Sequence, residues 1–170
     1  MKLLLLLAVL CGTPGFVKSQ IKVFIVRHAD RAGNADDLTP AGVARAEELK
    51  HVLGLAKVQR IFSTNTIRTT KTAQPLATLM GLPVNIYATA PAVAALIKGN
   101  PAIKANFIVG HSDTVDDLIK ACGCTPPPAI TPAMPTTQYD NLFVLVLRKP
   151  CVGKVYTCEL THLRYSAITP

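Results

Sequence analysis

Short apolar runs alternate with helical segments along most of this chain, and this alternation limits the folds that are open to it. Residues 21–26 form a continuous apolar and β-branched run with one lysine, typical of a strand buried on both faces of a parallel sheet. Residues 41–54 follow Thr39-Pro40 and repeat apolar side chains at helical spacing, namely Val43, Ala46, Leu49, Val52 and Leu53. Strands that alternate with helices form βαβ units, so the pattern predicts an α/β protein.

The same alternation continues toward the C-terminus. We expect a strand at 58–62, a helix at 66–80, a strand at 84–87, a helix at 91–97, a strand at 106–109 and a helix at 113–121 capped by Ser112. Prolines after Cys124 predict an ordered loop or flap. Two strands at 142–147 and 155–163, joined across Gly153, complete the sheet. The predicted fold is a single-domain three-layer sandwich, in which helices flank a mostly parallel central sheet with an antiparallel C-terminal edge.

The first residues indicate export. Met1-Lys2 precedes an apolar run over 3–10 that is too short to span a bilayer, and Val17-Lys18-Ser19 suits a signal peptidase. We therefore expect a signal peptide at 1–19, a single mature domain at 20–170, and a secreted or periplasmic location. Lipid attachment at Cys11 is the alternative, and only then would a membrane be a partner. Leu10 before it is bulkier than the small residue that such sites usually need.

Four cysteines remain after residue 19, and an oxidising compartment favours two disulfides. Cys122 and Cys124 flank a single glycine, which is poor geometry for a mutual bridge, so each is expected to pair with Cys151 or Cys158 in either arrangement. A four-cysteine zinc site would need wider spacing.

The formal charge of +8, to which Lys2 and Lys18 contribute two, is spread without basic runs. A nucleic-acid surface would show clustered basic and aromatic residues, so no nucleic-acid partner is expected. A diffuse positive field favours anionic small substrates, although it also fits ordinary solubility. Oligomeric state stays open.

Charged side chains follow three of the predicted strands. Arg27-His28 ends the first strand, Arg68 opens the helix after the second, and His111 follows the strand at 106–109 and precedes a helix N-terminus. Ligands of open α/β sheets bind beyond these carboxyl ends. Two arginines and two histidines suit a phosphoryl group, because guanidinium forks bind its oxygens bidentately. A neutral imidazole can attack phosphorus and form a covalent intermediate.

Four blocks occur in a characteristic order: Val26-Arg27-His28-Ala29, Leu38-Thr39-Pro40-Ala41-Gly42, Ser63 with Arg68 and Thr72-Ala73, and Gly110-His111-Ser112. Together they resemble the histidine phosphatase superfamily (phosphoglycerate mutase-like). Tyr139-Asp140-Asn141-Leu142-Phe143 resembles a segment of its small secreted members. The resemblance implies a metal-independent phosphatase without cofactor, which hydrolyses phosphomonoesters or other phosphoryl compounds through a phosphohistidine intermediate.

The resemblance also implies residue roles. His28 is the nucleophile, Arg27 and Arg68 clamp the phosphate, and His111 donates to a phosphoryl oxygen. Asn34 falls where many members place a phosphate-contacting asparagine, although it could belong to a turn with Gly33. Ser63 and Asp30 are further candidates for substrate binding.

The usual general acid is missing, because no Asp or Glu occurs from Thr69 through Gly110. Asp113 is the better replacement and Asp30 the second. Asp113 could instead cap a helix, and Asp30 could pair with Arg31 or orient the loop after the first strand. Otherwise the substrate needs a good leaving group.

Two other functions stay open. A secreted protein could keep the phosphate pocket and bind phosphate or a phospho-ligand with little or no turnover. A mutase is disfavoured by the predicted signal peptide. No metal is expected, because arginines and helix N-termini supply the positive charge. His51 and His162 are expected outside the site, and specificity is expected in the loops at 89–100 and the proline-rich flap.

Overall fold

The structure is a computed structural model that describes residues 17–150 and 155–167. Within these residues one sheet has the strand order β3-β2-β4-β1-β5-β6. Its strands are β1 (Val17–Arg27), β2 (Arg60–Ser63), β3 (Val84–Ile86), β4 (Ala105–Gly110), β5 (Asn141–Pro150) and β6 (Thr157–Arg164). The strands β1 to β4 pair in parallel, whereas β5 runs antiparallel to β1 and β6 antiparallel to β5. The predicted mixed sheet is confirmed.

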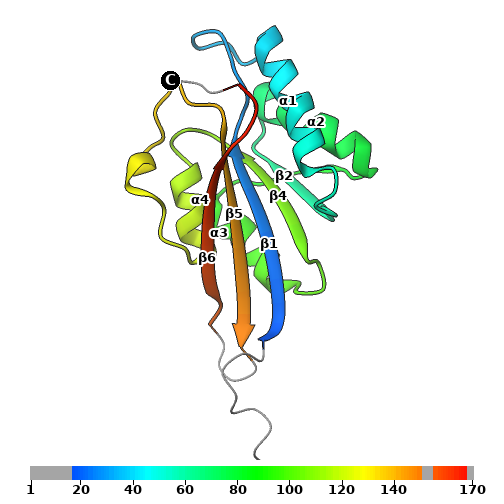
Figure 1. Cartoon of the computed structure of the whole chain (residues 1–170), viewed down its shortest axis with the longest axis vertical. Helices are drawn as coiled ribbons and strands as arrows, with labels where there is room; N and C mark the ends of the chain where they lie inside the picture. Colours follow the sequence, from blue (N-terminus) through cyan, green and yellow to red (C-terminus); the bar gives the residue numbers. More distant parts are fainter. Residues whose placement is uncertain (1–16, 151–154, 168–170) are drawn as a thin grey trace, which may run out of the picture.

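Helices cover both faces of this sheet (Figure 1). They are α1 (Pro40–Leu53), α2 (Ile67–Met80), α3 (Ala90–Gly99) and α4 (Val115–Cys122), with a 3₁₀ turn, η1 (Pro128–Ile130), in the proline-rich segment. Helices α1 and α2 lie together on one face, and α3 and α4 on the other (Figure 1). The predicted three-layer sandwich of one domain is therefore present.

Strand β1 supplies side chains to both layers of the core. Ile21, Val23 and Ile25 pack on the α3–α4 side, while Phe24 and Val26 pack on the α1–α2 side. Successive strand residues point to opposite faces, so a strand covered on both sides needs apolar residues throughout. This explains the continuous apolar run in the sequence.

Helix α1 begins as predicted but buries a narrower face. Thr39 caps it by accepting a hydrogen bond from Gly42 N (3.1 Å). Ala46, Leu49 and Leu53 are buried, whereas Val43 and Val52, which belong to the same helical spacing, are 50% and 45% exposed. The helix instead buries Arg45, which faces the loop after β1 and pairs with it.

A close approach between α1 and that loop depends on Gly42. A Cβ atom at this position would lie 2.2 Å from Asp30 O, well inside van der Waals contact. Glycine here therefore lets the helix start directly against the loop that follows the strand end.

Helix α4 starts later than predicted. Its N-cap is Thr114, whose side chain makes no cap hydrogen bond, and Thr114 Oγ1 instead accepts from His111 N (2.9 Å). Residues 112–114 form a turn, and Ser112 O accepts from Met134 N (2.7 Å). The prediction that Ser112 caps this helix is wrong, because a turn separates it from the first helical residue.

One predicted disulfide is present and one predicted pairing is wrong. Cys124 and Cys158 form a disulfide across a Cα–Cα distance of 5.1 Å, which ties the segment after α4 to β6. Cys122 is a free thiol at the end of α4, where it packs in the core and is 1% exposed. Gly123 then adopts a positive φ of 97°, which turns the chain before Cys124. Cys151 and the predicted connection across Gly153 lie outside the described residues.

Strand β1 begins at Val17, before the predicted mature N-terminus. A chain that starts at Gln20 would keep the β1–β5 pairs from Gln20 opposite Arg148 onward. The predicted signal peptide otherwise lies outside the described residues. No helix in the described part of the chain has the length and apolar content needed to cross a membrane.

Candidate active site

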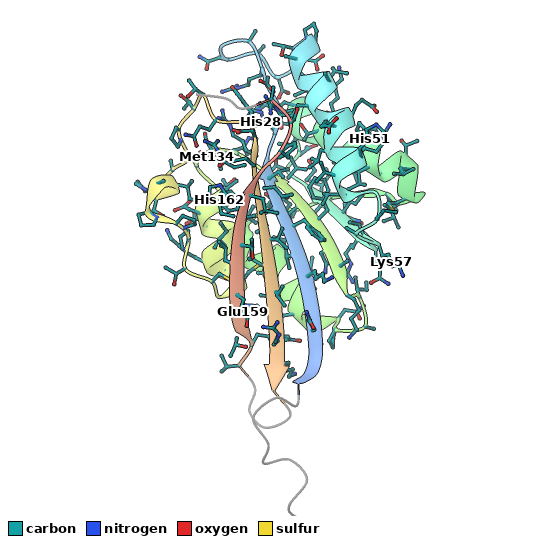
Figure 2. The ribbon with its side chains drawn as sticks, in the orientation of Figure 1. His28, His51, Lys57, Met134, Glu159 and His162 are labelled. Carbon is teal, nitrogen blue, oxygen red and sulfur yellow. A yellow bond between two sulfur atoms is a disulfide. The ribbon has the colours of Figure 1, made fainter. Side chains whose placement is uncertain are left out.

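Two histidines lie side by side at the carboxyl edge of the sheet. Arg27 pairs with Gly110 in the β1–β4 register, and His28 N donates to Gly110 O (2.9 Å), which extends the ladder by one residue. His28 and His111, which directly follow these paired residues, therefore lie side by side. Their ring centroids are 5.5 Å apart. Figure 2 shows His28 at this end of β1.

The His28 side chain is held as a neutral imidazole. Nδ1 lies 2.8 Å from Ala29 O, and a carbonyl can only accept, so Nδ1 carries the proton and Nε2 keeps its lone pair. Burial, together with the charge of Arg27, lowers the pKa of His28 to about 3. Ala29 N donates to Thr72 Oγ1 (2.9 Å), which fixes the backbone at this point.

Arg27 is 2% exposed and is held by the loop before β5. Its Nη1 donates to three carbonyl oxygens, those of Pro135 (3.2 Å), Thr136 (2.7 Å) and Gln138 (3.1 Å). The guanidinium also lies over the Tyr139 ring, 4.1 Å from its centroid. Arg27 Nε is buried without a hydrogen-bond partner.

Arg68 joins the second histidine to α2. Its Nη2 donates to His111 Nδ1 (3.3 Å), so His111 Nε2 carries the proton and donates to Thr64 Oγ1 (2.8 Å). Burial and the positive charge of Arg68 lower the pKa of His111. Arg68 Nη1 pairs with Asp36 Oδ1 (2.6 Å), and Asp36 Oδ2 also accepts from Ile67 N (3.3 Å).

Unused donors make this cluster suited to an anion. The Nε–H groups of Arg27 and Arg68 are both buried without a partner. Buried donors are normally satisfied, and two of them on cations beside two imidazoles suit the oxygens of a phosphoryl group. Within the described residues, no group of three or more His, Cys, Asp or Glu side chains is placed to hold a metal ion.

The other predicted residues lie in different surroundings. Asp30 Oδ2 pairs with Arg45 Nε at 2.6 Å, so the expected pairing with Arg31 is wrong, and Asp30 serves to join the loop to α1. Arg45 is a buried cation and needs a counter-charge, which explains why Asp30 pairs with it. Ser63 is fully buried, and its hydroxyl donates to Thr64 O (2.9 Å). Asn34 is exposed next to Gly33, whose φ is +50°.

Asp113 is exposed, and its charge acts to raise the pKa of His111. The acidic residues in the first turn of α4 are instead Asp116 and Asp117, and Thr114 is the N-cap. Asp113 is therefore not the capping residue of this helix.

Neither remaining histidine belongs to the cluster (Figure 2). His51 is exposed on α1. His162 lies on β6, where Nε2 is 2.6 Å from Asn141 Oδ1 and the ring stacks on Phe143.

Sequence reasoning missed three contacts of the site. Thr64 binds His111, Asp36 binds Arg68, and the Tyr139 ring lies 5.9 Å from that of His28. Two adjacent acidic residues, 36 and 37, precede the predicted helix, and this pattern could have indicated a carboxylate partner for a nearby arginine. Tyr139 had been noted only as part of a resemblance, without a contact.

A cavity of about 660 Å³ adjoins the site through Thr64. Its other lining residues come from the start of α3 and from α4, and they include Tyr87, Thr89, Pro91, Thr114 and Lys120. The predicted specificity loop at 89–100 thus contributes to a hollow beside His111.

A comparison with models of protein families matches a segment that contains part of this site. Residues 23–89 match the histidine phosphatase superfamily (branch 1). This segment contains Arg27, His28 and Arg68, and His111 lies beyond it. No curated protein is similar enough in sequence to match.

Solved structures extend the likeness to most of the chain. Mycobacterial hydrolase 1 superposes with a TM-score of 0.65 at 17% identity, covering 87% of this chain and 100% of its own. A mycobacterial glucosyl-3-phosphoglycerate phosphatase gives 0.62 at 16% identity, covering 75% and 91%. A phosphoserine phosphatase from Entamoeba histolytica, in complex with 3-phosphoglyceric acid, gives 0.56 at 15% identity, covering 75% and 90%. The fold is that of the histidine phosphatases.

Proposed function

We propose that this protein is a metal-independent phosphatase that hydrolyses phosphomonoesters or other phosphoryl compounds through a phosphohistidine intermediate on His28. The observation that carries the proposal is the state of His28, a buried neutral imidazole with an unprotonated Nε2. It lies beside two arginines that each keep a buried N–H without a partner. A nucleophile and a binding site for the phosphoryl oxygens therefore occur together.

The reaction has two steps in this proposal. His28 Nε2 attacks phosphorus while the bond to the leaving oxygen breaks, and Arg27, Arg68 and His111 donate hydrogen bonds to the phosphoryl oxygens. Water then attacks the phosphohistidine, the P–N bond breaks, and phosphate leaves. The leaving oxygen needs a proton, and Asp113 is the carboxyl group that the sequence puts forward for it.

The substrate class follows from the size of the hollow and from the relatives. Two of the similar structures are by name phosphatases of small phosphorylated molecules. The cavity beside Thr64 has room for the rest of such a substrate. We propose a phosphorylated small molecule as substrate and no cofactor. Asn34 is proposed to reach the substrate from the loop after β1. The Cys124–Cys158 disulfide supports a secreted or periplasmic location.

The test compares three forms of the chain from Gln20 on p-nitrophenyl phosphate with chelator present. We expect turnover by the unaltered chain, loss to background in His28→Ala, and no change in His51→Ala, whose histidine is exposed on α1. A ³²P-labelled substrate quenched in alkali should leave an acid-labile label on His28. Equal turnover in His28→Ala and the unaltered chain would refute the proposal.

A second function is favoured by one observation, the engagement of the nearby carboxylates. Asp30 pairs with Arg45 and Asp36 with Arg68, so the anion site lacks a carboxylic acid that is free to protonate a leaving group. A phosphate-binding pseudoenzyme would bind phosphate or vanadate in calorimetry, lose that binding in Arg68→Ala, and release no phosphate from any substrate.

A further inference from the structure

Residues 134–140 are the C-terminal part of the segment predicted as a flap after Cys124, and they alone are called the flap from here on; they lie against the rim of the sheet near His28. Met134 N donates to Ser112 O (2.7 Å), beside the second histidine. At the other end Asp140 is fully buried and pairs with Arg164 (2.6 Å). Figure 2 shows Met134 and His28 at the same end of the molecule. Contacts at both ends of the flap therefore hold it in place, and Tyr139 lies between them.

Tyr139 contacts the reacting centre from this flap. Its ring centroid lies 4.1 Å from Arg27 Cζ and 5.9 Å from the centroid of His28. The contact with Tyr139 acts to raise the pKa of Arg27, against the larger effect of burial, which lowers it. A phenol hydroxyl can both accept a hydrogen bond and donate its proton.

The carboxylates around the site are poorly suited to protonate a leaving group. Asp30 is paired with Arg45, and Asp36 with Arg68, which keeps their oxygens occupied as acceptors. Asp113 is exposed to solvent. Exposed carboxylic acids have lost their proton at neutral pH, whereas a phenol retains it. Tyr139 instead carries a hydroxyl donor on the ring that contacts Arg27 and His28.

We propose that Tyr139 is the catalytic acid and base of the phosphatase reaction proposed above, on which this inference rests. As the bond from His28 Nε2 to phosphorus forms and the bond to the leaving oxygen breaks, the Tyr139 proton passes to that oxygen. The resulting phenolate lies next to the Arg27 guanidinium, which stabilises its charge. In the second step the attacking water gives its proton to the phenolate, which restores Tyr139 as phosphate leaves.

The experiment measures kcat for phosphate esters whose leaving alcohols differ in acidity, from p-nitrophenyl through phenyl to alkyl phosphates. Tyr139→Phe keeps the ring over Arg27 and removes only the hydroxyl group. We expect it to lose about 10²- to 10⁴-fold on alkyl phosphates, and less than about threefold on p-nitrophenyl phosphate, whose leaving group needs no acid. Tyr156→Phe is the matched control, because Tyr156 donates to Lys98 O elsewhere in the fold and should behave as the unaltered chain.

Several outcomes would overturn the proposal. An equal loss on every ester in Tyr139→Phe would make Tyr139 a positioning residue for Arg27. A loss confined to alkyl esters in Asp113→Asn, with Tyr139→Phe unchanged, would make Asp113 the acid. Either result would leave the proposed function intact, whereas no turnover and no label on His28 in the unaltered chain would refute both proposals together.

Discussion

The two arginines of the site carry the same charge but are held in different ways. Arg27, in the region of β1 and the flap, is 2% exposed and is held by neutral carbonyls and an aromatic ring. Arg68, in the region of β2 and α2, has an 18% exposed side chain and is held by Asp36, whose side chain is 49% exposed. A cation fixed by neutral groups depends on the fold around it, whereas one fixed by an exposed carboxylate depends on a pair that solvent weakens. One clamp is therefore part of the core and the other belongs to the surface.

Replacement of each arginine by alanine should separate the two regions most strongly. Both variants should lose about 10²- to 10³-fold in kcat, because each removes donors to the phosphoryl group. Arg27→Ala should also lower the free energy of unfolding by about 2–4 kcal/mol, because it leaves carbonyl oxygens without their donor. Arg68→Ala should change it little. Urea unfolding beside steady-state kinetics measures both effects, and equal destabilisation by the two changes would contradict the comparison.

The β1–flap region should also make stability depend on pH. The pKa of His28 is about 3 in the fold, so between about pH 6.5 and pH 3 the unfolded chain binds a proton that the folded chain does not. The His28 contribution to the unfolding free energy should therefore decrease by about 1.4 kcal/mol for each pH unit as the pH falls through this interval.

His28→Asn isolates this contribution, because His111 and His162 also have lowered pKa values and shift stability in the same direction. The difference between the unaltered chain and His28→Asn in urea unfolding should shrink as the pH is lowered from 6.5 toward 4. A difference that stays constant would mean that His28 titrates normally in the fold.

The smallest effect is expected at Asp36, the exposed partner of Arg68. Asp36→Asn weakens the ion pair that orients Arg68, so kcat/KM should fall about 3- to 10-fold, in line with the modest strength of exposed pairs. Asp37→Asn is the control, because Asp37 pairs with Lys71, which takes no part in the site. Equal effects of the two changes on phosphatase kinetics would show that Asp36 acts only through its negative charge and not through its pairing with Arg68.

The sequence predicted the parts of the site that follow from strand ends. Arg27, His28 and His111 come directly after apolar runs, and the carboxyl ends of parallel strands meet at one edge of the sheet, so their convergence could be foreseen. Contacts between loops could not. The pairing of Arg68 with Asp36 spans 32 residues, and that of Arg27 with Thr136 spans 109. Neither loop has a periodic pattern from which its path could be derived.

Predictions about single side chains failed where tertiary packing decides. Val52 has the spacing of a core residue but lies on the exposed side of α1. Cys122 counts toward an even number of cysteines, yet its place at the end of α4 turns it into the core. The segment that contains Tyr139 was recognised as a pattern, but its position over Arg27 depends on the path of the flap.

The hydrogen bond from His28 to Gly110 has a consequence for how this protein can change. It places the two histidines at the ends of adjacent strands, β1 and β4, so the distance between the two histidines is set by the spacing of adjacent strands, about 4.8 Å. Changes in the surface loops do not alter this spacing. Exchange of the flap or of the loop before α3 could therefore redirect the protein to new substrates while the chemistry stays in place, whereas a one-residue insertion in β4 would abolish it.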